Sequence, residues 1–80
     1  MTLDQHEWAY RKLEGSLKEY ARGISQKATL EWIVGEVKFA TEKAGLSSEE
    51  VKGILGKVEL YASDAERKGR LVRLREHLRL

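Results

Sequence analysis

Few residues of this 80-residue chain have the type and spacing that catalysis requires. His6 and His77 lie far apart in the sequence, and the chain has no cysteine that could join them as a metal ligand. Ser16 follows Gly15 but lacks the second glycine and the strand-to-helix turn of a nucleophile elbow. We therefore expect no catalytic residue, metal, cofactor or small-molecule substrate, and the chain is predicted not to be an enzyme.

Cations crowd the C-terminal segment. Residues 66–80 hold six Lys and Arg against two Asp and Glu, a net charge of +4, whereas residues 1–65 hold nine against eleven, a net charge of −2. Cations at a helix C-terminus complement the helix dipole, so a solvated helix end is one interpretation. Binding of nucleic-acid phosphates is the alternative. The cations are Arg67, Lys68, Arg70, Arg73, Arg75 and Arg79.

A local pattern also bears on nucleic acid. Residues 21–32 resemble the turn and recognition helix of helix-turn-helix DNA-binding domains, and the Gly-Ile-Ser-Gln tetrapeptide at 23–26 carries the resemblance. The resemblance implies a degenerate helix-turn-helix over residues 13–35 in which Ser25, Gln26, Lys27 and Thr29 face DNA, with Gln26 and Lys27 as the added nucleic-acid contacts.

Large apolar residues also occur opposite the expected core of each helix. In the second helix Trp32 and Phe39 form a narrow stripe between charged positions, with Gly35 between them. An interior Gly costs a helix about 1 kcal/mol relative to Ala, so a Gly beside large apolar groups indicates close approach of another backbone. The surface predicted to bind a protein partner or a second copy of the chain comprises Trp8, Trp32, Gly35, Phe39, Leu60, Leu71, Leu74 and Leu78.

A second interpretation of the aromatic residues stays open. The C-terminal segment could fold back over Trp8, Trp32 and Phe39, and these side chains would then be ordinary core residues. An amphipathic C-terminal helix could instead dock in a partner's groove through its leucines, with its arginines at the sides.

The fold class follows from apolar residues that recur at spacings of three and four, which is typical of amphipathic helices. Three segments show this pattern, and we expect their apolar positions to face a common core. These positions are Leu3, His6, Tyr10, Leu13, Leu17, Tyr20, Ala21 and Ile24; Leu30, Ile33, Val34, Val37, Ala40 and Ala44; and Val51, Ile54, Leu55, Val58, Tyr61, Ala62 and Ala65.

Start and stop signals divide these segments. The first helix is predicted to begin after Asp4 and to end at Gly23, and Ser25 is predicted to cap the second helix. Gly45 ends the second helix, and the Ser-x-x-Glu capping box at 47–50 starts the third. These signals predict short loops between neighbouring helices.

The predicted architecture is all-α. We expect an up-down-up three-helix bundle over residues 1–69 and a basic helical extension over residues 70–80 of the same single domain. The leucines of the extension continue the helical angle of Leu60, so the extension either packs on the bundle or projects from it. A break at Gly69 is expected to separate the two parts.

Composition narrows the class of protein. No apolar run approaches the length of a membrane span, and we expect a cytoplasmic protein that does not bind membranes. The absence of Cys and Asn together with 35% charged residues is typical of thermophile proteins. The sequence therefore predicts a small non-enzymatic accessory or assembly subunit, with nucleic-acid binding as the alternative function.

Overall fold

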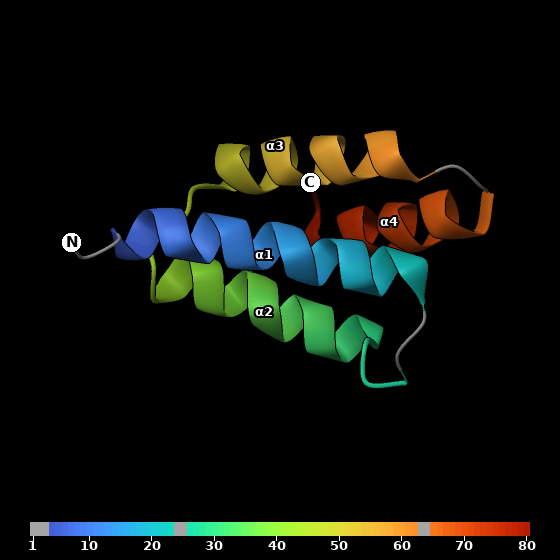
Figure 1. Cartoon of the computed structure of the whole chain (residues 1–80), viewed down its shortest axis with the longest axis horizontal. Coiled ribbons are helices and arrows are strands. Elements are labelled where there is room, and N and C mark those ends of the chain that lie inside the picture. Colours follow the sequence, from blue (N-terminus) through green and yellow to red (C-terminus); the bar gives the residue numbers. More distant parts are fainter. Residues whose placement is uncertain (1–3, 24–25, 63–64) are drawn as a thin grey trace.

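Four helices are formed by the residues that the computed structural model describes, which are 4–23, 26–62 and 65–80 (Figure 1). No strand occurs in these ranges. The described part of the chain is thus all-helical, as its periodicity predicted, and its fourth helix begins before residue 70, where the helical extension was expected to start. The helices are α1 (Gln5–Arg22), α2 (Leu30–Glu42), α3 (Ser48–Tyr61) and α4 (Ala65–Leu78).

Capping residues explain where α1 and α3 begin and where α1 ends. The Asp4 side chain accepts a hydrogen bond from the backbone N–H of His6 at 3.2 Å. Gly23 ends α1 in the left-handed conformation, with φ of 65°. At α3, Ser47 and Glu50 form both hydrogen bonds of the predicted capping box, at 3.2 and 3.1 Å. These three predicted boundaries are confirmed.

The predicted start of α2 is wrong. Ser25 lies outside the described residues, and the cap is Thr29, whose hydroxyl accepts a hydrogen bond from the Trp32 N–H at 3.1 Å. Because the helix starts after Thr29, Gln26 and Lys27 lie in the connection between α1 and α2. They do not open the recognition helix that the helix-turn-helix resemblance implied.

The helices are arranged around α1. Successive helices run in opposite directions, with α2 and α3 on either side of α1 and α4 alongside both α1 and α3 (Figure 1). α1 contacts each of the other three helices, and α4 also contacts α2 and α3. The molecule measures 39 × 25 × 22 Å along its principal axes.

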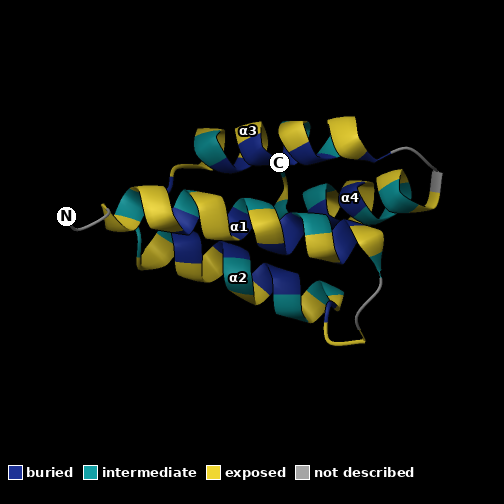
Figure 2. Ribbon diagram, in the orientation of Figure 1, coloured by how far each residue is buried: buried dark blue, intermediate teal, exposed yellow. Residues whose placement is uncertain are grey.

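α4 is part of the bundle. It begins at Ala65, so Gly69 lies within it, and its Leu71 and Leu74 are fully buried. Each buried leucine stabilises the fold by about 1.5–3 kcal/mol, which favours packing of this segment over projection into solvent. Buried positions line the facing sides of all four helices (Figure 2). The core comprises Ala9, Leu13, Leu17, Tyr20, Ala21, Ile33, Val34, Val37, Ala40, Leu46, Val51, Ile54, Leu55, Val58, Ala62, Leu71 and Leu74.

Several predicted core positions lie elsewhere or outside the described part. Tyr61 is 67% exposed at the last residue of α3, where Lys18 of α1 lies 4.6 Å from its ring centroid. Leu3 and Ile24 lie outside the described residues, as does the side chain of Ala65. Within the described part of the chain, no helix is long and apolar enough to cross a membrane.

Candidate functional site

Trp8 of α1 and Phe39 of α2 lie next to each other on the outside of the bundle. Because α1 and α2 run antiparallel, the start of α1 lies beside the end of α2 (Figure 1). The exposed fraction is 46% for Trp8 and 48% for Phe39. Lys12 places its ammonium nitrogen 4.9 Å from the centroid of the Trp8 ring and 5.7 Å from that of Phe39. One cation therefore bridges two half-exposed aromatic rings.

A shallow groove continues from these rings along α2. Trp32 forms part of its wall, and this side chain is partly buried because it also packs against the core. The groove is lined by Lys12, Glu31, Trp32, Gly35, Glu36 and Phe39. We define the aromatic surface as Trp8, Lys12, Trp32, Gly35 and Phe39.

The charges around the aromatic surface have both signs. Lys12 lies over the two rings, and Glu31 and Glu36 lie along the groove. A cation over an exposed aromatic ring contributes about 0.5–1 kcal/mol, which is less than burial of either ring against an apolar partner would contribute. Lys12 therefore covers the rings in part without removing their tendency to be buried.

Gly35 has no packing role within the part of the chain that the structure describes. A Cβ atom added at Gly35 would meet none of the described atoms within 4 Å, apart from its own helix backbone. Alanine would fit there and would stabilise α2 by about 0.5–1 kcal/mol. The absence of a side chain instead leaves the α2 backbone accessible in the middle of the groove.

The structure brings together half of the residues predicted to bind a partner. Trp8, Trp32, Gly35 and Phe39 all belong to the aromatic surface. Leu60 does not, because it lies on the outer side of α3 with an exposed fraction of 86%.

The leucines of α4 are also separate from this surface. Leu71 and Leu74 are fully buried in the core, and Leu78 packs against the core with part of its side chain exposed. These leucines were predicted to lie with Leu60 because they continue its helical angle if one helix runs through the junction. That continuity does not hold, since α3 ends at Tyr61 and α4 starts anew at Ala65.

Lys12 is the member of the aromatic surface that sequence reasoning missed. The signal was available, because residues four apart lie on the same side of a helix and Lys12 follows Trp8 by four positions. The contact with Phe39 had no such signal, because it depends on how α1 and α2 pack.

Comparisons with protein-family models, curated proteins and solved structures found no match for this chain.

Two of the six C-terminal cations have structural roles at the bundle surface. Arg70 donates a hydrogen bond to the backbone carbonyl of Tyr20 at 3.4 Å, and the Tyr20 hydroxyl donates one to the Arg70 carbonyl at 3.2 Å. Burial raises the pKa of Tyr20, which keeps this hydroxyl protonated as a donor. Arg75 pairs with Glu59 of α3 at 2.5 Å.

Of the other cations, Arg73 lies beside Arg70, since both line one shallow pocket next to Tyr20. Arg67 is partly buried and has an interaction partner, whereas Lys68, Arg73 and Arg79 are exposed. The predicted nucleic-acid contacts Gln26 and Lys27 lie in the α1–α2 connection and are exposed. Lys27 also has an interaction partner.

The two histidines lie in different surroundings. His6 pairs with Glu50 through its Nε2 atom, 2.8 Å from a carboxylate oxygen, and so joins α1 to the start of α3. His77 is exposed near the end of α4, and Ser16 is buried within α1. Among the described residues, no group of three His, Cys, Asp or Glu side chains is placed to hold a metal ion.

Proposed function

We propose that this chain is a non-enzymatic assembly module that associates with a second protein molecule through its aromatic surface. The observation that supports the proposal is the pair of Trp8 and Phe39, each about half exposed and adjacent on neighbouring helices. Exposed large aromatic side chains that lie together are more common at interfaces than on ordinary surfaces, where apolar residues are scattered singly.

A second copy of the chain is the partner that the charges favour. Lys12 of one copy can approach Glu31 or Glu36 of the other, so the surface is complementary to itself about a two-fold axis. Gly35 allows the facing helix to come close, and the rings of Trp8 and Phe39 supply apolar area that the partner would bury.

The first experiment measures molar mass by light scattering over a wide range of protein concentrations. We expect the mass to rise from monomer toward dimer, and the double variant Trp8→Ala, Phe39→Ala to remain monomeric at the same concentrations. Val72→Ala on α4, which also removes a half-exposed apolar side chain, serves as the control and should associate like the unaltered protein.

The Gly35→Ala variant distinguishes an effect on association from an effect on folding stability. The added methyl group should raise the free energy of unfolding by about 0.5–1 kcal/mol, because alanine favours the helix. The same methyl group should weaken association, because it occupies the place of closest approach. Gly53→Ala on α3 is the matched control, since it should stabilise the fold and leave association unchanged. A mass that stays monomeric at every concentration would rule out self-association.

Nucleic-acid binding through the C-terminal cations is the second proposal. It has less support, because Arg70 and Arg75 already contact the bundle. Exposed Lys68, Arg73 and Arg79 would have to supply most of the affinity. Binding to DNA or RNA at low salt that weakens steeply as salt is added would support this proposal, and no binding at low salt would exclude it.

A further inference from the structure

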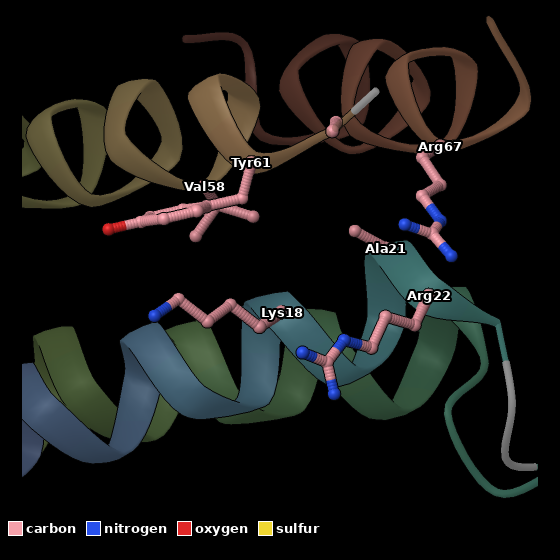
Figure 3. Close-up of a pocket in the computed structure, with 7 residues that line it drawn as sticks. Lys18, Ala21, Arg22, Val58, Tyr61 and Arg67 are labelled. Atoms are coloured by element: carbon pink, nitrogen blue, oxygen red, sulfur yellow. The ribbon is translucent and has the colours of Figure 1, made fainter. Parts of the chain in front are cut away.

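A second groove lies at the opposite end of α1 from Trp8. It is enclosed by the last turns of α1, the end of α3 and the start of α4, and has a volume of about 300 Å³ (Figure 3). Three cationic side chains line it: Lys18 and Arg22 from α1 and Arg67 from α4. No carboxylate side chain is among the described residues that line this groove.

The floor of the groove is apolar. Ala21, Val58 and Ala62 are buried there and belong to the edge of the bundle core or adjoin it. Tyr61 lies across the groove from α1, with Lys18 4.6 Å from its ring centroid (Figure 3). The groove thus offers cations at its sides and an aromatic ring with small apolar side chains in its interior.

The cations differ in how far they are already neutralised. Lys18 lies 3.4 Å from the Glu14 carboxylate, and Arg67 has an interaction partner. The Arg22 side chain forms no hydrogen bond or ion pair within the described part of the chain. Its guanidinium is therefore the group with the most to gain from an anion in the groove.

The dipole of α1 favours Arg22 in the last turn of that helix, but it does not account for Arg67, which belongs to α4. Cations are favoured near a helix C-terminus, but Arg70 is the side chain that binds a terminal carbonyl of α1, at Tyr20. Arg22 and Lys18 instead extend along the α1 side of the groove, and Arg67 reaches toward the same space from α4 (Figure 3).

We propose that this groove binds a small organic phosphate whose ester group is aromatic or apolar. A phosphate monoester carries nearly two negative charges at neutral pH, which suits three surrounding cations better than a singly charged carboxylate does. The apolar floor and Tyr61 would contact the ester group. The volume is at the lower end of the range for small-molecule sites, about 300–1,000 Å³, which favours a compact ligand.

Phenyl phosphate is a suitable probe. We expect it to shift the backbone amide NMR signals of Ala21, Arg22 and Ala62 in a saturable manner and with higher affinity than inorganic phosphate. Arg22→Gln should raise the dissociation constant about tenfold, because it removes one charge-assisted contact. Arg11→Gln is the matched control, since it removes the same charge from an exposed position of the same helix. This control should keep the affinity of the unaltered protein.

Three results would overturn the proposal. The first is the absence of saturable shifts at these amides. The second is an equal loss of affinity in Arg11→Gln and Arg22→Gln, which would indicate general attraction to a cationic surface. The third is equal or tighter binding at the same amides by phenol, or by a short DNA strand without a terminal phosphate, because neither carries a phosphate monoester.

Discussion

Gly23 and Arg70 together form the C-terminal end of α1: Gly23 has no side chain, and the Arg70 side chain occupies the space above it. Gly23 has φ of 65°, and a Cβ atom at this position would lie 2.7 Å from the Arg70 guanidinium carbon. The absence of that atom lets Arg70 reach the Tyr20 carbonyl, which lies at the end of α1 and also accepts a hydrogen bond from the Gly23 N–H. Gly23 is thus required both for its backbone conformation and for the space above it.

Gly23→Ala should therefore destabilise the protein more than a positive φ alone would. Left-handed backbone costs a non-glycine residue about 1–2 kcal/mol, and disturbance of the Arg70 contact should add about 1 kcal/mol. Gly45→Ala is the control, because Gly45 has φ of 77° with open space around it. Urea denaturation followed by circular dichroism measures both. In an Arg70→Ala background the two substitutions should cost the same, and a persisting difference would contradict the assigned contact.

At the scale of the element, the start of α3 combines a capping box with a contact to another helix. The hydrogen bond from the Ser47 backbone lowers the pKa of Glu50, and the hydrogen bond with the His6 side chain lowers it further. The folded protein therefore favours the Glu50 carboxylate over its protonated form. This contribution to stability is complete above the unfolded pKa near 4.5 and is lost as the pH falls through the lower folded value.

Glu50→Gln should reduce this dependence on pH. The variant should be less stable than the unaltered protein at about pH 7, and the difference should be smaller at about pH 3, because Glu50 begins to lose its charge as the pH falls below its unfolded pKa. Urea denaturation at both pH values measures the effect. Glu49→Gln removes a neighbouring carboxylate but keeps the capping box, so its stability should follow the same pH dependence as the unaltered protein. A Glu50→Gln difference that is constant with pH would contradict this account.

At the scale of the whole molecule, α4 and the other helices share one core. Leu74 is fully buried in it, whereas Val72 on the same helix is 50% exposed. Leu74→Ala should lower the free energy of unfolding by about 2–5 kcal/mol, and Val72→Ala should change it by no more than about 0.5 kcal/mol. Thermal denaturation monitored by circular dichroism and by tryptophan fluorescence should show one coincident transition. A separate early transition of α4, with little effect of Leu74→Ala on the remainder, would show that α4 is an appendage.

The two candidate surfaces lie at opposite ends of α1. The aromatic surface lies between the start of α1 and α2, and the cationic groove lies where the end of α1 meets α3 and α4. Substitutions in one surface are far from those in the other along α1, so association and phosphate binding can be tested independently. Arg22→Gln should weaken phosphate binding and leave self-association intact. The double variant Trp8→Ala, Phe39→Ala should lose self-association and keep phosphate binding.

The sequence by itself determined the local features of this protein. The helical class, the buried stripes of α1 and α2, the end of α1 at Gly23, the left-handed Gly45 and the Ser47–Glu50 capping box all depend on residues close together in the chain. The aromatic residues outside the core stripe, Trp8, Trp32 and Phe39, were also found from their spacing alone, because successive residues are rotated by a constant angle around a helix.

Only the tertiary structure decided what depends on helices meeting. Local signals offered several capping or breaking residues without ranking them. The structure uses Thr29 rather than Ser25 as the cap of α2, and it starts α4 before Gly69. These helix boundaries decide which leucines are buried. Because α4 starts in a new direction, Leu71 and Leu74 lie in the core, whereas Leu60 is exposed. Helix packing brings together side chains that are distant in the sequence. It places Lys12 near Phe39, and it places Arg22 and Arg67 in the same groove.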